Sequence, residues 1–230
     1  MASTLAILAV LAVLAARWLS HQGLATKPWL EPGIGAGDGP PGWPAATIGL
    51  AVFLAVAACL FGLLLSAFSM RMQGGFWRPL PASGLLWVNT AALVAAGAAL
   101  QWAKVSADRG EVDGVRICLL AGGVFSLAFL AGQAILWRQM VAAGYGLASP
   151  AGAFFMLLTG LHGLHLAGGL VALGRTGVLA WYRPDPARLR HSVGRCAAYW
   201  HFLLLVWLFV AATLSGFAGL VIETCRQWLA

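Results

Sequence analysis

Long apolar stretches separated by short polar ones make up most of this 230-residue chain. A helix needs about 20 apolar residues to cross a hydrocarbon core of roughly 30 Å, and six stretches approach or exceed that length. They lie near residues 3–20, 46–70, 84–103, 115–137, 150–174 and 196–222. Because they are apolar throughout, without the alternating polarity of barrel strands, they predict an all-α bundle of six transmembrane helices.

A segment rich in proline and glycine separates the first stretch from the other five. Five prolines between residues 28 and 44 alternate with glycines, which disfavours a regular helix or strand. We therefore expect an N-terminal helix and linker over residues 1–45, followed by a five-helix bundle over residues 46–230. The first stretch lacks the basic start of a secretory signal, so we expect it to be retained as a helix.

Composition and charge support a membrane protein with a defined orientation. The chain is 61% hydrophobic and only 9% charged. If six helices span the membrane, ten basic residues fall on one side and four on the other, and the positive-inside rule makes the richer side cytoplasmic. The ten are Arg17, Lys27, Lys104, Arg109, Arg116, Arg175, Arg183, Arg188, Arg190 and Arg195. The net charge of +7 thus comes mostly from basic residues in the loops of one side, which does not favour nucleic-acid binding. Because six spans are an even number, both termini should face outward.

Polar residues inside the predicted spans indicate packing rather than transport. All seven acidic residues lie in loops or at span ends, so no carboxylate is available mid-membrane for a proton relay. Small residues spaced by four, such as Gly168 and Ala172, are typical of close helix contacts. Several side chains can form hydrogen bonds between helices: Asn89, Thr90, Gln101, Gln133 and Thr159.

Three histidines in the apolar spans are the candidate site for chemistry. His162 and His165 are three residues apart on one span, and His201 on the last span could face them. One ring from each span could ligate a b-type haem, which would make the chain a free-standing membrane cytochrome. We favour neutral histidines hydrogen-bonded with Thr159 and Tyr199, because no carboxylate or thiolate supports a metal site. Four widely spaced cysteines, without a Cys-x-x-Cys pair, are expected to be small buried thiols.

Four motifs in order along the chain carry a family resemblance. They are Leu86-Trp87-Val88-Asn89-Thr90, Gly132-Gln133 before Trp137, Thr159-Gly160-Leu161-His162-Gly163-Leu164-His165 with Gly168-Gly169, and Tyr199-Trp200-His201-Phe202 with Val206-Trp207. Over roughly residues 46–222 the chain resembles subunit III of the haem–copper oxidases, in a divergent bacterial branch. A subunit III-like accessory protein of nitric oxide reductase and a quinol oxidase subunit III share these helices and are the alternatives.

The resemblance implies a non-catalytic subunit of a respiratory oxidase in the bacterial inner membrane, with both termini periplasmic. Such a subunit binds directly beside subunit I, together with subunit II and other subunits of the complex, and stabilises subunit I. It holds phospholipid between its helices. Haem and copper belong to the partner subunits, and this chain would hold no catalytic centre, cofactor or metal.

Under this reading the site residues are structural or lipid-binding. The structural candidates are Gln133, Thr159, His162, His165, Tyr199, Trp200 and His201. Arg188 and Arg190, just before the predicted last span, are our first candidates for lipid phosphate contact. Two positions depart from the family pattern, since Ala57 replaces a membrane glutamate and Leu204 replaces an aspartate. The resemblance therefore does not extend to roles that rest on those carboxylates.

Overall fold

Five long helices account for nearly all of the chain that the computed structural model describes, which is residues 45–72, 84–182 and 185–215. They are α2 (Ala45–Met72), α3 (Gly84–Asp108), α4 (Val112–Ala142), α5 (Pro150–Tyr182) and α6 (Pro186–Leu214). Each is long and apolar enough to cross a membrane, which confirms the all-helical class and five of the predicted spans. The predicted helix at residues 3–20 and the proline- and glycine-rich segment lie outside the described residues.

The last helix begins ten residues earlier than hydropathy predicts, at Pro186 rather than at residue 196. The Asp185 carboxylate caps it by accepting hydrogen bonds from the backbone N–H groups of Ala187, at 3.1 Å, and Arg188, at 3.5 Å. Proline at the first helical position adds a preset φ angle without losing a hydrogen bond. The predicted spans near 150–174 and 196–222 leave residues 175–195 as a loop, which is wrong, because α5 continues to Tyr182 and most of this segment is helical.

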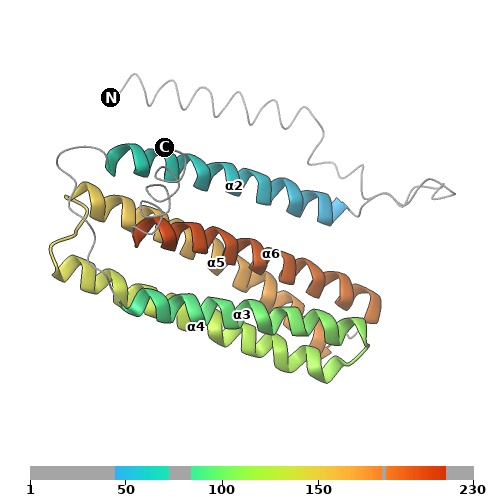
Figure 1. The fold of residues 1–230 in the computed structure, drawn as a ribbon. Helices are drawn as coiled ribbons and strands as arrows, with labels where there is room; N and C mark the ends of the chain where they lie inside the picture. Colours follow the sequence, from blue (N-terminus) through green and yellow to red (C-terminus); the bar gives the residue numbers. More distant parts are fainter. Residues whose placement is uncertain (1–44, 73–83, 183–184, 216–230) are drawn as a thin grey trace, which may run out of the picture. The chain divides into compact units, whose positions relative to one another are not determined.

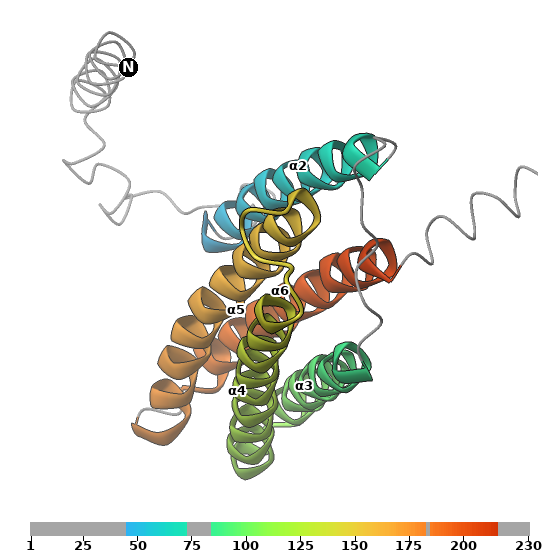
Figure 2. The same ribbon diagram turned by 90° about the vertical axis from the view of Figure 1, so that its left-hand side faces the viewer.

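Helices α3, α4, α5 and α6 form a closed four-helix bundle. Each packs on the next in that order, and α6 packs back against α3. Consecutive helices run in opposite directions (Figure 1). Helix α2 contacts α5 and α6, on the side away from α3 and α4 (Figure 2). Two short connections need glycine, because Gly110 and Gly144 have φ angles of +77° and +84°, in the left-handed region.

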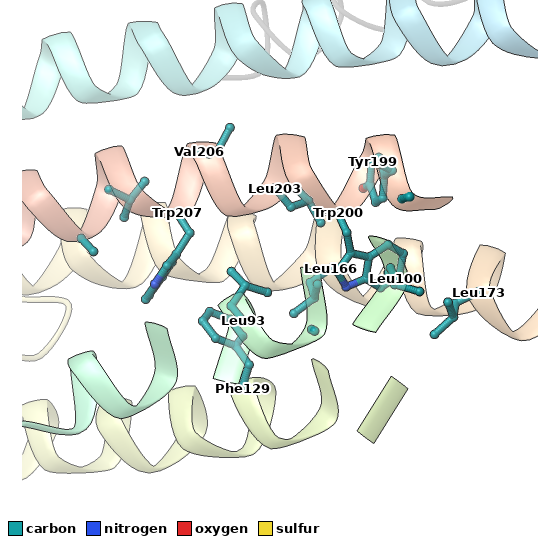
Figure 3. Packing of buried hydrophobic residues seen from close by; sticks show 14 of the residues in the cluster. Leu93, Leu100, Phe129, Leu166, Leu173, Tyr199, Trp200, Leu203, Val206 and Trp207 are labelled. Carbon is teal, nitrogen blue, oxygen red and sulfur yellow. The ribbon is translucent and has the colours of Figure 1, made fainter. Parts of the chain in front are cut away.

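Large side chains fill the middle of this four-helix bundle. Trp200 and Trp207 are fully buried, and their side chains project from α6 toward α3 and α4 (Figure 3). The rings of Phe129 and Trp207 meet edge to face, with centroids 4.7 Å apart. These two tryptophans therefore reach α4 across the middle of the four-helix bundle, although the backbones of α4 and α6 do not approach closely.

Three indole groups join helices through the same hydrogen-bonded relay. Each indole N–H donates to a hydroxyl on another helix, and that hydroxyl donates to the carbonyl four residues before it. The pairs are Trp207 with Thr90 at 3.0 Å, Trp200 with Ser126 at 2.9 Å and Trp137 with Thr159 at 2.9 Å. Because both polar groups of each pair are satisfied inside the bundle, the relays link α3, α4, α5 and α6 without leaving a buried donor unpaired.

Candidate functional site

The three histidines do not form one cluster. His162 is fully buried on α5, and its Nε2–H donates to the Leu203 carbonyl of α6 at 3.1 Å. His165 is half-buried, and its Nδ1–H donates to the Leu161 carbonyl of its own helix at 2.8 Å. His201 is exposed on α6, so the expectation that it faces His162 and His165 is wrong.

The hydrogen-bond partners also differ from those expected for neutral histidines. Thr159 pairs with Trp137 rather than with a histidine, and the Tyr199 hydroxyl donates to the backbone carbonyl of His165 at 2.8 Å. His162 does form an interhelical hydrogen bond, but to a backbone oxygen. Its ring is enclosed by the rings of Phe61, Phe129 and Trp207, at centroid distances of 5.1 to 6.4 Å. An imidazole in this apolar enclosure fills space and joins two helices.

Glycines of the recognised motifs lie against polar side chains of neighbouring helices. A Cβ atom at Gly132 on α4 would collide with the Asn89 side chain on α3, whose Nδ2–H donates to the side-chain Oε1 of Gln133 at 3.4 Å. A Cβ atom at Gly169 would lie 2.6 Å from the Tyr199 ring. The motifs therefore contact each other in pairs, which gives Gln133, Tyr199 and Trp200 packing roles.

A groove lies between α2, α5 and α6. Its volume is about 690 Å³, and its walls are largely apolar. The lining residues come from three helices: Ala46, Leu50 and Phe53; Leu164, His165, Gly168, Gly169, Ala172, Arg175 and Thr176; and Ser192, Arg195, Cys196, Tyr199 and Trp200. Gly168 and Ala172 are exposed to it, so the expected close helix contact through this pair is wrong.

Polar and cationic groups occupy one part of this groove. The Thr176 hydroxyl lies 3.1 Å from the Ser192 hydroxyl and 3.4 Å from the Cys196 thiol, bridging α5 and α6. Arg175 and Arg195 line the same part of the groove, and neither pairs with a carboxylate among the described residues. The groove thus combines a long apolar wall with two free guanidinium groups, which suits an amphiphile that carries an anionic group.

Arg188 and Arg190 have acidic partners instead. Arg188 lies 3.3 Å from Asp185 within the first turn of α6, and Arg190 pairs with Asp108 at the end of α3 at 2.5 Å. Both are exposed and lie in helix rather than before it. Their contact with lipid phosphate stays a prediction, whereas the position of Arg175 and Arg195 was not anticipated. In the sequence those two arginines count only among the basic residues between predicted spans, and their spacing alone does not reveal a shared groove.

Basic residues gather at one end of the described bundle. Arg71 and Arg138 lie toward the opposite end. The end where α3 and α5 finish carries seven: Lys104, Arg109, Arg116, Arg175, Arg188, Arg190 and Arg195. Arg116 joins α4 to the end of α5, because its Nε–H donates to the Ala180 carbonyl at 3.1 Å and its guanidinium lies 5.7 Å from the Trp181 ring.

Acidic and thiol groups follow the expected pattern in part. The described acids, Asp108, Glu111, Asp113 and Asp185, lie at helix ends, as expected. Ala57, where the resemblance implies a glutamate, is buried on α2, and Leu204 is half-buried near Gly97. Cys196 is buried but Cys59 is exposed, so the expectation of buried thiols is wrong for Cys59. Among the described residues, no group of three or more His, Cys, Asp or Glu side chains is placed to hold a metal ion.

Comparison with known proteins agrees with the motifs. Residues 47–217 match the family model described as cytochrome c oxidase subunit III. A probable cytochrome c oxidase subunit 3 of Mycobacterium tuberculosis is 35% identical over 172 residues, which cover 70% of this chain and 83% of that relative. A probable cytochrome c oxidase subunit 3 of Nocardia farcinica is 34% identical, with coverages of 73% and 86%. A cytochrome c oxidase subunit 3 of Thermostichus vulcanus is 29% identical, with coverages of 70% and 82%.

Proposed function

The chain belongs to the cytochrome c oxidase subunit III family, and we propose that within its oxidase it binds one anionic phospholipid in the α2–α5–α6 groove. It is a subunit III of a haem–copper oxidase, so it lies in a membrane and associates with other oxidase subunits. We place the haem and copper in those partner subunits, with direct contact to subunit I and proximity to subunit II. The membrane is the bacterial inner membrane, with both termini periplasmic.

The single observation that supports lipid binding is the composition of the groove. Its apolar wall, formed by residues such as Leu50, Phe53 and Leu164, suits acyl chains. Arg175 and Arg195 supply two positive charges near the headgroup level, each contributing about 1 kcal/mol to the binding of an anionic lipid. The hydroxyls of Thr176 and Ser192 lie beside them and can donate hydrogen bonds to phosphate oxygens.

Lipid in this groove would also stabilise the subunit and its neighbours. Helix α2 packs on α5 and α6 over a limited surface, and an acyl chain would fill the space that Gly168 and Ala172 leave open. We propose that this keeps α2 in place and supports subunit I during sustained turnover. The effect would be structural, without any chemical step in this chain.

The test purifies the oxidase complex through a tag on this chain and measures three quantities. Haem spectra and copper content identify the partner subunits, mass spectrometry counts phospholipids per complex, and oxygen consumption over time gives the decay of activity. In the variant Arg175→Gln/Arg195→Gln, we expect anionic lipid retention to fall by about tenfold or more. The matched control is Arg71→Gln/Arg138→Gln, which removes two arginines toward the opposite end of the bundle and should retain the lipid.

A second variant tests the apolar part of the groove. A Cβ at Gly168 would meet nothing within 4 Å, so Gly168→Leu places a side chain in the groove without a clash. We expect it to displace the lipid while all arginines remain. Unchanged lipid content in both groove variants would contradict lipid binding here. Absence of haem- and copper-bearing subunits from the wild-type preparation would contradict the assembly itself.

A further inference from the structure

Two polar side chains on the outer face of the α3–α6 pair differ from the other amides and imidazoles of the inner bundle. Asn89, Gln133 and His162 are buried, but Gln101 on α3 and His201 on α6 are exposed. Gln101 was expected to form a hydrogen bond between helices, yet within the described part of the chain its amide has no hydrogen-bond partner. The spans thus present two unsatisfied polar groups to their surroundings.

The His201 ring has one defined free acceptor. Its Nδ1 lies 2.6 Å from the Ala197 carbonyl oxygen. A carbonyl oxygen only accepts, so Nδ1 carries the hydrogen and, in the neutral ring, Nε2 presents a lone pair. No described residue donates to Nε2. His201 therefore presents a hydrogen-bond acceptor at the surface of α6.

Gln101 and His201 lie along the seam where α3 and α6 meet. The ion pair between Asp108 and Arg190 joins the outer edges of these two helices. Gln101 precedes Asp108 by seven residues, and His201 follows Arg190 by eleven. These separations are about two and three helical turns, so each polar residue lies on the same side of its helix as the ion-paired residue.

The depth of His201 makes its exposure to lipid unfavourable. At a rise of about 1.5 Å per residue, Gln101 lies roughly 10 Å and His201 roughly 16 Å along the helix axis from the ion pair. His201 therefore lies inside the apolar part of its span, whereas Gln101, three residues before Lys104, lies nearer the edge of its span. Hydrocarbon offers no hydrogen bond to an amide or an imidazole, and polar side chains at such depth normally face protein.

We infer that the outer α3–α6 face around Gln101 and His201 receives a transmembrane helix of another oxidase subunit, which donates a hydroxyl or N–H to His201 Nε2. The inference rests on the proposed function, because it needs the oxidase complex. The surface suits close approach: Ala198 is exposed beside His201, and a Cβ at Gly194 would meet nothing within 4 Å. Small side chains at these positions let a partner backbone come near enough to form the hydrogen bond.

Site-specific crosslinking in the intact complex tests the location of the contact. A photo-reactive p-benzoyl-phenylalanine replaces Ala198, and a control chain carries it at Val124, which is 62% exposed on α4. We expect irradiation to join position 198 to another oxidase subunit, identified by mass spectrometry of the crosslinked peptide. Crosslinking of position 198 only to lipid, in a preparation where this chain co-purifies with the haem-bearing subunit, would overturn the inference and leave the proposed function standing.

Substitution of the acceptor tests the chemistry. His201→Leu should lower the fraction of complexes that keep this chain after a detergent wash by about fivefold, the effect of one interhelical hydrogen bond. His201→Gln, which retains an acceptor, should restore most of that retention, and His191→Leu on the exposed first turns of α6 should change nothing. Circular dichroism of each variant chain confirms that the helices form. Equal retention of the His201→Leu and wild-type chains would overturn the hydrogen bond.

Discussion

Trp207 on α6 donates its indole N–H to the hydroxyl of Thr90 on α3, 3.0 Å away, although 117 residues separate them in the chain. The Thr90 hydroxyl in turn donates a hydrogen bond to the backbone carbonyl of Leu86 at 2.8 Å. Both residues belong to the motifs that identify the family, and their contact explains why a tryptophan and a threonine occur there. Buried motif residues such as these hold helices together, whereas His165 of the same motifs borders the groove and His201 is exposed on the outer α3–α6 face.

The first prediction concerns this relay. Thr90→Val removes the acceptor while keeping the shape, and Trp207→Phe removes the donor, so each should lower the free energy of unfolding. A double-mutant cycle should give a coupling of about 0.5–1.5 kcal/mol, measured by reversible unfolding of the purified chain in mixed micelles. Thr213→Val is the control, because the Thr213 hydroxyl bonds only to a carbonyl of its own helix. Purely additive effects of the two substitutions would contradict the relay.

A second prediction concerns the contact between α3 and α4. Gly132→Ala places a methyl group against the Asn89 side chain and should destabilise the chain by about 1–3 kcal/mol through overpacking. Removing the obstacle with Asn89→Ala in the same chain should recover part of this loss. Gly62→Ala on α2, where a Cβ meets nothing within 4 Å, should be neutral or slightly stabilising. Thermal unfolding followed by circular dichroism distinguishes these variants.

Replacement of the buried histidine gives a third prediction. His162→Leu loses the hydrogen bond to the Leu203 carbonyl and should weaken the chain by about 1 kcal/mol. The haem and copper content of the purified complex, measured per subunit I, should stay the same, because His162 is enclosed by aromatic rings of its own bundle. His165→Gln should behave in the same way. Loss of haem or copper in proportion to the substituted chain would show that these imidazoles are ligands after all.

The orientation of the bundle gives a fourth prediction. The end of the described bundle that carries seven basic residues should face the cytoplasm. In a chain with its four cysteines replaced by serine, His191→Cys should react with a membrane-impermeant thiol reagent only in inside-out vesicles. Leu147→Cys, on the exposed connection between α4 and α5, should react only in right-side-out vesicles. The reverse labelling pattern would contradict this orientation of the bundle.

The sequence alone determined the class of the protein, the five described spans and the family. Those properties follow from the lengths of the apolar stretches and from motifs within single helices, such as Thr159 to His165. Both can be recognised without knowing how the helices pack. The starting point of α6 was missed because Arg188 and Arg190 lower the hydropathy of its first turns, although Asp185 and Pro186 form a good helix start. Capping chemistry decides that boundary rather than apolar content.

Only the tertiary structure decided which side of each helix faces a neighbour. In a water-soluble protein an apolar stripe marks the buried face of a helix. In a membrane both the lipid and the protein interior are apolar, so apolar residues do not show which face is buried. The rotation of α6 turns Trp200 and Trp207 inward and His201 outward, and its pairing with α5 brings Arg195 to the same groove as Arg175. These relations depend on contacts between distant residues, such as Gly169 against Tyr199, and close packing selects them.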